Sequence, residues 1–435
     1  MNELLTDEMK TLVLLTSQFP FGTGESFIGS EYSLLTQSFQ KIIIIAQNVN
    51  KEKTRITSDN TKIYRYNPST SLLGFLYIPI LFFPNFITII NIIKAEIRFR
   101  KTSGDPMKTG NVALLLKKIF KALQLRNFII AALSQESISE SIVFYSYWLK
   151  TGAHAIALLN YRNSIKIARA HGSDIYEEKT EAGYLPLLRF TALNLNALFF
   201  VSKDGKSYFE QKTKMKNPNF FVSYLGVTRP DVDITKANKS NKYVIVSCSN
   251  LIPLKRIDLI IYALASVKCT REIEWFHFGD GILRTELEKI ADKTLGSLKG
   301  ITYRFMGYYA NDDLLRFYSA NRVDLFINAS STEGVPVSIM EAQSFGIPVI
   351  ATDVGGVKEV VNESTGSLIR ADFSQVDLVQ LIEYYTNLTE KESDDIRENA
   401  EKNWNSNFNA VSNYKDFILK VNSILATDKE QTQTH

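Results

Sequence analysis

Two glutamates, Glu333 and Glu341, lie eight positions apart in the stretch EGVPVSIME. Gly334 and Pro336 stand between them, ahead of a short apolar run. Proline is tolerated in the first turn of a helix, where its missing N–H costs nothing, and glycine lets a ligand approach the backbone closely. The stretch therefore predicts a loop that runs into a helix near Val337, with Glu333 on the loop and Glu341 in the first turns of the helix.

The chemistry of such a turn suits a phosphorylated sugar. The free amides of a helix N-terminus attract phosphate. From its place in the helix, Glu341 can accept hydrogen bonds from vicinal hydroxyls such as those of a ribose, and Glu333 can reach a sugar beyond the phosphates. A loop that favours diphosphate, placed between two such carboxylates, indicates a nucleotide-sugar site. A capped helix with two solvated glutamates is the alternative interpretation.

The segments before and after this loop alternate between predicted strands and predicted helices, as in a doubly wound α/β fold. Continuous apolar runs, rather than alternating ones, predict parallel strands that are covered on both faces. A polar segment at 229–242 indicates a linker between two such series. Since these folds bind ligands at the carboxyl ends of their strands, a cleft between the two domains is the expected site. The predicted strands are 11–16, 41–47, 141–148, 165–172 and 197–202, then 243–249, 273–278, 301–307, 324–330 and 348–353.

Size and composition limit the classes of function. The chain has 435 residues, enough for two domains, and a net charge of +4 from 50 basic and 46 acidic residues. This balance argues against a nucleic-acid binder, whose binding face is strongly basic. Cys248 and Cys269 form neither a disulfide framework nor a metal-ligand pattern, and we expect both in the core. The N-terminus lacks the features of a secretory signal, so we expect a cytoplasmic protein.

One stretch departs from the soluble pattern. Residues 72–93 carry no charged side chain and are long enough to span a bilayer. Because Pro79 and Pro84 interrupt the stretch, we favour an element at the membrane surface over a spanning helix or a buried core element. The basic and apolar segments 94–101 and 115–129 suit an anionic leaflet. For the second of them an ordinary amphipathic helix is nearly as good an interpretation.

The stretch around the two glutamates resembles a known family. From Ser330 to Gly356 the chain follows S-x-x-E-G-x-P-x-x-x-x-E-A-x-x-x-G-x-P-V-I-A-T-D-x-G-G, which is similar to the E-x7-E signature of retaining glycosyltransferases of family 4, in the GT-B superfamily. The resemblance spans most of residues 11–410. It implies two Rossmann-like domains that face each other across a cleft. The implied parts are an acceptor-binding domain at 1–230 with an insert at 72–135 that matches no motif, a nucleotide-sugar-binding domain at 236–410, and a C-terminal helix at 411–427 that packs back toward the first domain.

Further stretches resemble the donor-site motifs of the family. In SNLIPLKRID, Lys255 takes the place of the lysine that neutralises the donor diphosphate, and Asn250 that of an arginine. Asn250 can still hydrogen-bond a phosphate. Arg256, in place of a glycine, either compensates for the missing charge or is a surface residue. The stretches FGDG and FMGYY resemble loops beside the nucleotide, although plain turn chemistry also explains them. The implied donor-binding residues are Gly22, Gly24, Asn250, Lys255, Tyr308, Gly334, Val335, Pro336, Val337 and Glu341.

Two stretches of the first half also match. RAHGSD resembles the H-G-x-D segment, which implies that His171 contacts the donor sugar near the reacting carbon; a histidine bonded structurally at a strand end is the alternative. Asp174 is an acceptor contact or the cap of the following turn. FGTGE takes the place of the first glycine-rich loop, where Glu25 would meet acceptor hydroxyls. The implied catalytic residues are His171, Glu333 and Lys255, and the implied acceptor contacts are Glu25 and Asp174.

The resemblance implies transfer of a sugar from a UDP- or GDP-linked donor to an acceptor hydroxyl, with retention of configuration. It implies no cofactor and no metal, and the sequence has no cluster with metal-ligand spacing. The apolar and basic insert suggests a lipid-linked glycan acceptor at the inner membrane face, as in the synthesis of bacterial capsule, exopolysaccharide or O-antigen.

Four other functions compete with this interpretation. A sugar-nucleotide epimerase or a phosphorylase would share the fold, but the E-x7-E context argues against both. A catalytically silent nucleotide-sugar-binding or scaffold subunit of a polysaccharide assembly complex stays open because of Asn250. A dehydrogenase is disfavoured because no G-x-G-x-x-G follows a strand.

Overall fold

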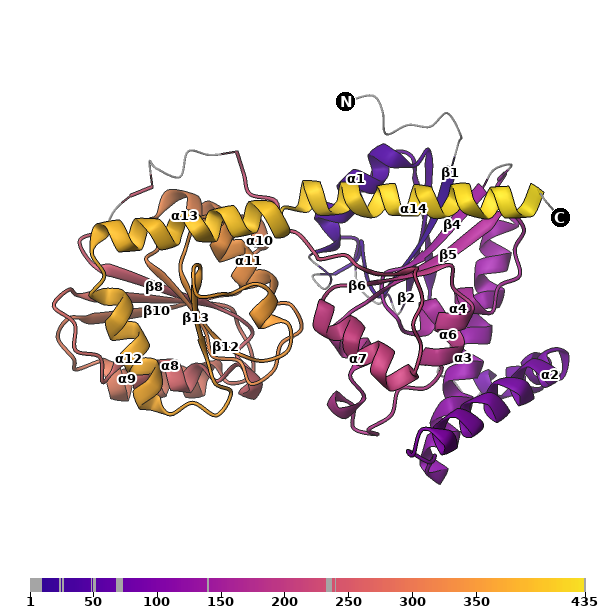
Figure 1. Cartoon of the computed structure of the whole chain (residues 1–435), viewed down its shortest axis with the longest axis horizontal. Coiled ribbons are helices and arrows are strands. Elements are labelled where there is room, and N and C mark those ends of the chain that lie inside the picture. The colour runs from indigo at the N-terminus through magenta and orange to yellow at the C-terminus, as the bar shows by residue number, and fades with distance from the viewer. Residues whose placement is uncertain are drawn as a thin grey trace. The chain divides into compact units, whose positions relative to one another are not determined.

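The chain forms two compact units. The computed structural model describes residues 10–22, 25, 27–47, 49, 52–67, 73–138, 141–231, 237, 238 and 240–433. One unit comprises Met1–Ser223 and Tyr414–His435, and the other Tyr224–Asn413 (Figure 1). The break falls at Ser223, earlier than the predicted linker, because the next segment joins the second unit: Val227 N donates to Phe408 O at 2.9 Å.

The first unit is built on a parallel sheet of seven strands in the order β3-β2-β1-β4-β5-β6-β7. Its strands are β1 Lys10–Thr16, β2 Lys41–Gln47, β3 Thr61–Tyr66, β4 Ser141–Ser146, β5 Ser164–Ala170, β6 Ala197–Phe200 and β7 Phe220–Val222. Its helices are α1 Ile28–Ser38, α2 Leu73–Thr102, α3 Thr109–Leu133, α4 Thr151–Ala157, α5 Gly172–Ile175, α6 Leu188–Leu193 and α7 Lys203–Thr213. The sequence missed the edge strands β3 and β7.

Both faces of this sheet are covered, as the continuous apolar runs predict. Alternate residues of β1 enter two different cores: Val13 packs with residues of α3 and α4, whereas Leu14 packs with residues of α1. The last helix, α14 (Ala410–Gln433), contributes Phe417 and Val421 to the core on the α1 side. From Tyr414 onward, α14 therefore belongs to the first unit (Figure 1).

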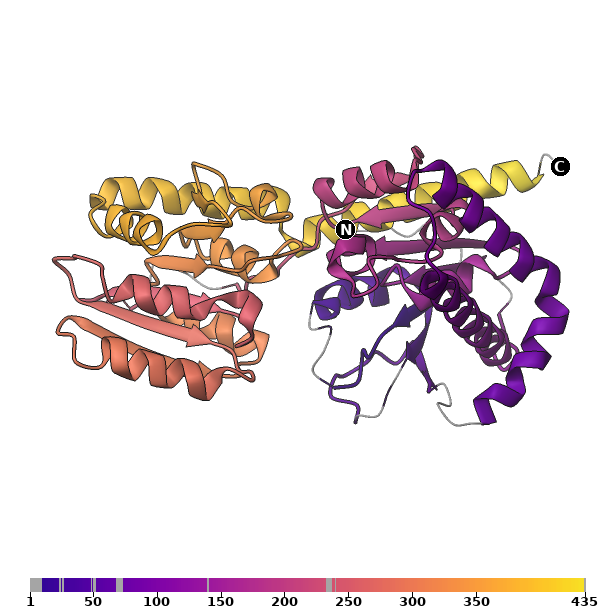
Figure 2. The same cartoon turned by 90° about the horizontal axis from the view of Figure 1, so that it is seen from below.

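The second unit has a parallel sheet of six strands in the order β10-β9-β8-β11-β12-β13, with helices on both of its faces (Figure 2). Its strands are β8 Tyr243–Cys248, β9 Ile273–Phe278, β10 Ile301–Gly307, β11 Leu325–Asn328, β12 Val349–Thr352 and β13 Gly366–Ile369. Its helices are α8 Ile257–Leu264, α9 Arg284–Leu295, α10 Asn311–Ala320, α11 Val337–Ser344, α12 Gln375–Thr386 and α13 Glu390–Asn407. The strand order reverses between β8 and β11, and such a switch point opens a crevice at the carboxyl ends of the strands.

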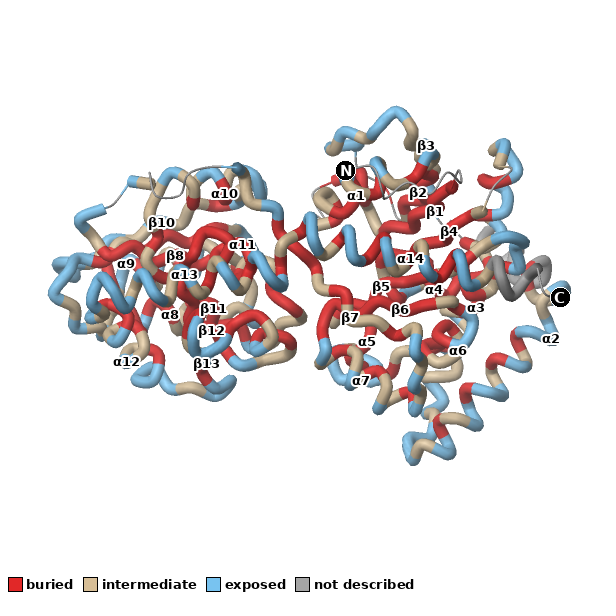
Figure 3. The backbone as a smooth tube through the Cα atoms, turned by 45° about the horizontal axis from the view of Figure 1, so that its top comes forward, coloured by how far each residue is buried: buried red, intermediate tan, exposed pale blue. Residues whose placement is uncertain are grey.

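The apolar stretch differs from the sequence prediction. Pro79 and Pro84 do not interrupt it: α2 runs unbroken from Leu73 to Thr102. The Asn85 amide donates to the Leu81 carbonyl at 2.8 Å, in the turn where Pro84 lacks a backbone N–H. One side of α2 packs on α3 in a small core of its own, and Figure 3 shows buried and exposed segments alternating along α2. Among the described residues, no helix is both long and apolar enough to cross a bilayer.

Candidate functional site

Except for Tyr308, which follows β10, the predicted donor residues of the second unit gather at the carboxyl ends of β8 and β11, on the two sides of the switch point. Lys255 follows β8 in a single 3-10 turn, and Glu333 follows β11. Lys255 Nζ lies 2.6 Å from Glu333 Oε1, and both side chains are largely buried. The Asn328 amide donates to the same carboxylate oxygen at 3.2 Å. A lysine and a glutamate held side by side at this edge can meet a phosphate and a sugar hydroxyl.

Two glycines after β12 hold the loop that carries Glu333. Gly356 N donates to Gly334 O at 2.8 Å. Gly355 has a φ of +56°, and a Cβ there would lie 2.2 Å from Glu333 O. Only glycine allows so close an approach of two backbone segments. The final G-G of the signature is therefore needed to position its first glutamate.

Arg256 supports the same loop from the other side. Its φ of +49° is in the left-handed region, which accounts for the glycine of the family pattern at this position. Its guanidinium donates to Ala329 O at 2.6 Å and to Ala371 O at 2.7 Å, and lies over the Phe373 ring. Neither interpretation from the sequence, a compensating phosphate contact or a surface position, describes this role. Arg256 ties the end of β11 to the segment that follows β13.

Glu341 lies in α11, which begins at Val337 as predicted. It is 6% exposed, and burial raises its pKa to about 7, although the Asn311 amide, which donates to Oε1, lowers it. Pro336 is the N-cap residue of α11 and Val335 is buried beside it.

Other polar groups in this region have unused hydrogen-bonding capacity. Among the described residues, Ser249 Oγ and Tyr318 Oη are buried atoms with no hydrogen-bond partner. Asn250 and Tyr308 are exposed, and Tyr308 follows β10. An isolated buried polar atom costs free energy, so Ser249 is a further candidate for contact with a bound ligand. Nothing in the sequence pointed to Ser249 beyond its place at the end of β8.

The predicted residues of the first unit lie at the carboxyl ends of its strands. His171 follows β5 and is buried, with its ring 4.4 Å from the Trp148 ring. Burial and, secondarily, the charge of Arg169 lower the pKa of His171 to about 3, so its ring is neutral. His171 Nε2 lies 3.1 Å from Tyr147 O, which can only accept, so Nε2 carries the hydrogen. The other nitrogen, Nδ1, is then an acceptor.

Both predicted acceptor contacts bind the backbone of the chain itself. Asp174 accepts from His171 N at 2.8 Å and from Leu149 N at 2.7 Å, which is the capping role considered for it. Glu25 accepts from the amides of residues 17–19, at 2.6–3.0 Å, and from the Trp148 indole. The two carboxylates thus hold loops at the edge of the sheet, and their contact with an acceptor stays a prediction.

Gly22 and Gly24 were expected to lie against the donor diphosphate. Gly22 has a φ of +60° and donates to Glu52 O at 3.1 Å. Gly24 lies outside the described residues.

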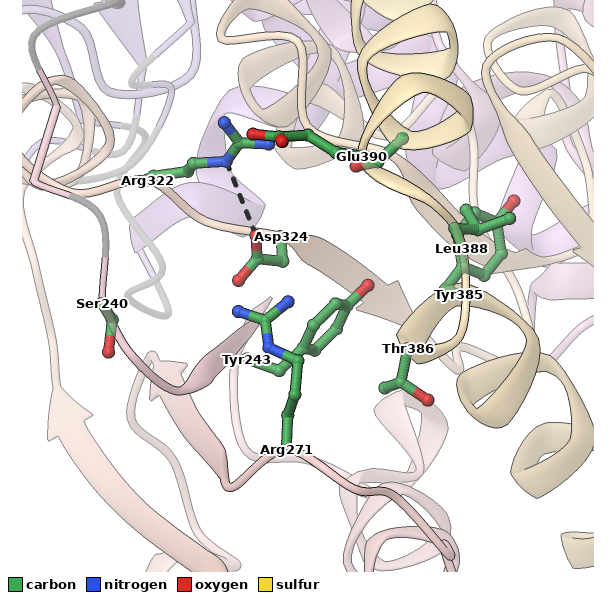
Figure 4. A pocket seen from close by; sticks show the side chains of 10 residues that line it. Ser240, Tyr243, Arg271, Arg322, Asp324, Tyr385, Thr386, Leu388 and Glu390 are labelled. Atoms are coloured by element: carbon green, nitrogen blue, oxygen red, sulfur yellow. Dashed lines mark ion pairs between the residues drawn. The ribbon is translucent and has the colours of Figure 1, made fainter.

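A separate cavity of about 200 Å³ opens at the opposite edge of the second sheet. Tyr243 at the start of β8, Arg271, and Asp324 just before β11 line it, and Asp324 pairs with Arg322 at 3.7 Å (Figure 4). None of the predicted site residues lines this cavity. Its mixed charges favour neither an anion nor a cation.

Residues 230–403 match the family described as glycosyl transferases group 1. The Salmonella typhi Vi polysaccharide biosynthesis protein is 36% identical over 24% of this chain and 17% of its own length. The phosphatidylinositol N-acetylglucosaminyltransferase GPI3 subunit of Saccharomyces cerevisiae is 28% identical over 45% of this chain and 43% of its own. The chain thus spans less than half the length of these curated relatives.

Solved structures confirm the predicted fold class. The Anabaena protein HepE, in complex with UDP, is 18% identical, and the similarity covers 95% of this chain and 100% of that one with a TM-score of 0.62. Sucrose-phosphate synthase from Thermosynechococcus elongatus is 13% identical over 96% of this chain and 100% of its own, with a TM-score of 0.66. Two parallel sheets flanked by helices are the GT-B fold that the resemblance to the E-x7-E signature implied.

Proposed function

We propose that the protein is a retaining, metal-independent glycosyltransferase that transfers a sugar from a nucleoside diphosphate sugar. The observation that carries the proposal is the Lys255–Glu333 pair, at 2.6 Å, beside the N-terminus of α11. A diphosphate leaving group develops negative charge as the sugar bond breaks. Lys255 and the amides at the start of α11 would stabilise that charge, a contribution of about 3 kcal/mol for one well-placed donor.

The donor is bound by the second unit. Glu341, fixed by Asn311, accepts from the two hydroxyls of the ribose. Glu333 accepts from a hydroxyl of the transferred sugar. His171, in the first unit, has Nδ1 as an acceptor for a sugar hydroxyl. A UDP-linked donor is supported by HepE, whose structures contain UDP and UDP-glucose. A GDP-linked donor is the second candidate, because a Corynebacterium glutamicum relative, 28% identical over 29% of this chain, is named as GDP-mannose-dependent.

The acceptor that we propose is a lipid-linked glycan in surface polysaccharide synthesis. Support comes from the names of the relatives: one is named for Vi polysaccharide biosynthesis, one for phosphatidylinositol and one for a phosphatidylinositol monomannoside. Such an acceptor places the reaction on the cytoplasmic, inner face of the cell membrane. A silent nucleotide-sugar-binding subunit is the competing proposal, since Asn250 lacks the charge of an arginine.

The test uses the purified full chain with a panel of UDP-, GDP- and ADP-linked sugars. Binding is followed by thermal shift and turnover by nucleotide release, with membrane extract as the source of acceptor. We expect one donor to bind and to be consumed, and Lys255→Gln to weaken both effects while Lys289→Gln, on the exposed side of α9, changes neither. Binding without turnover in the presence of extract would favour the silent subunit, and no binding of any donor would refute both.

A further inference from the structure

The outward side of α2 presents apolar and basic side chains to solvent. Phe83 is 76% exposed, Ile87 74%, Phe86 48% and Ile97 42%. The exposed cations of the same helix continue the series at spacings of three and four residues, which keep side chains on one side of a helix. We call this surface the α2 outer face; it consists of Phe83, Phe86, Ile87, Lys94, Ile97, Arg98 and Lys101.

The helix α2 already has a packing partner, so its exposed apolar residues are not those of an unpacked helix. The opposite side of α2 is already buried, with Ile89 and Ile92 against Leu115 and Ile119 of α3. A helix that uses one apolar side for folding and exposes another has a second surface to bury. Large apolar groups in solvent, grouped together rather than scattered, mark an interaction site.

The charges of α2 are separated by side. Between Phe83 and Lys101 the sequence holds one acidic residue, Glu96, and it is buried. Glu96 accepts from the Tyr184 hydroxyl at 2.9 Å. The buried Arg100 pairs with Glu177 of the neighbouring 3-10 turn and with Asp105, the latter at 2.9 Å. Ion pairs therefore fix the inner side of α2 to the unit, and the outer face carries only positive charge.

We propose that the α2 outer face docks the protein on an anionic lipid surface. Phenylalanine and isoleucine side chains enter the boundary between headgroups and acyl chains, and the three cations of the same face meet anionic headgroups. The arrangement suits a helix that lies on a membrane surface. Phe83, Phe86 and Ile87 lie toward one end of α2, and the three cations lie toward the other end on the same side. A protein partner would need a matched acidic groove, and a second copy of this face would be repelled by its own charge.

The test is co-sedimentation of the full chain with vesicles of phosphatidylcholine, with or without phosphatidylglycerol, and without donor or acceptor. We expect binding to the anionic vesicles only, and a loss of roughly a hundredfold in affinity for the triple variant Lys94→Glu, Arg98→Glu, Lys101→Glu. Phe83→Ser with Ile87→Ser should weaken binding without changing its salt dependence. The control reverses three exposed lysines of the other unit, Lys289, Lys293 and Lys299, and should bind as wild type does.

Unchanged vesicle binding by the charge-reversed α2 variant, with its melting temperature intact, would overturn the proposal. So would a wild-type dimer that the same substitutions dissociate, because the face would then be an interface between copies. The assay contains no sugar nucleotide, so its outcome is independent of whether the protein transfers a sugar.

Discussion

Glu341 is a buried carboxylate whose ionisation costs stability when no ligand is bound. Burial raises its pKa from 4.5 to about 7. Between these values the folded protein holds a proton that the unfolded chain has released. The free energy of unfolding therefore falls as the pH rises from 4.5 to 7, and it stays lower above 7. We predict that Glu341→Gln, which removes the charge and keeps the shape, stabilises the protein at pH 8.

The size of the effect follows from the same values. A rise from 4.5 to about 7 corresponds to about 3 kcal/mol at pH 8. The oxygen of Gln can still accept from the Asn311 amide, but its NH₂ group, if unpaired, takes back about 1–2 kcal/mol. The expected net gain is about 1–2 kcal/mol, or roughly 2–8 °C in Tm for a unit of this size.

Urea unfolding of wild type and Glu341→Gln at pH 5, 6, 7 and 8 measures this difference. The advantage of the variant should grow with pH up to 7 and then level off. Glu286→Gln, on the exposed side of α9, controls for the loss of a carboxylate in the same unit. The same Glu341→Gln protein should bind the donor more weakly, because a neutral amide accepts more weakly from ribose hydroxyls. A stability difference that is constant from pH 5 to pH 8 would refute the reasoning.

Three further predictions concern the loops at the two sheets. Gly355→Ala should cost about 1–3 kcal/mol of stability and weaken donor binding in calorimetry, because its Cβ meets the loop of Glu333 at 2.2 Å; Gly183→Ala, with a φ of +59° but open space around it, should cost stability alone. Arg256→Gly should weaken donor binding about tenfold, because it removes the hydrogen bonds from Arg256 that tie the end of β11 to the segment after β13. If Arg256→Lys restored binding, the charge of Arg256 would matter rather than these hydrogen bonds. His171→Phe should lower the turnover rate without changing the shape of the pH–rate profile between 5 and 8, since the pKa of His171 is already about 3; a lost inflection near pH 6.5 would contradict this.

The loop and helix that carry Glu333 and Glu341 could be predicted from sequence because their determinants are local. Pro336 and Gly334 specify a loop that enters a helix, and the apolar run before them specifies a buried strand, so α11 begins at Val337 as expected. The parallel strands of both cores were predictable for the same reason. The edge strands β3 and β7 were not, because β3, with the sequence TKIYRY, has no continuous apolar run and β7 is only three residues long.

The contacts that fix the residues of the candidate site come from distant parts of the chain, and no local pattern reveals them. Asn311 reaches Glu341 across 30 positions, and Arg256 reaches Ala329 across 73. The unbroken course of α2 through Pro84 also depends on tertiary structure, since packing against α3 outweighs the loss of a backbone hydrogen bond. Sequence propensity alone therefore predicts a break in α2 that the folded protein does not have.

The proposed function depends most on Lys255 binding the diphosphate of a nucleotide sugar. The most direct measurement is the affinity of the full chain for a nucleoside diphosphate and for the same nucleoside without phosphate, in wild type and Lys255→Gln. Gln can still donate to Glu333, so the loop should keep its place. We expect a loss of roughly ten- to a hundredfold in affinity for the diphosphate and none for the nucleoside. An equal loss for both ligands, or no loss for either, would contradict it.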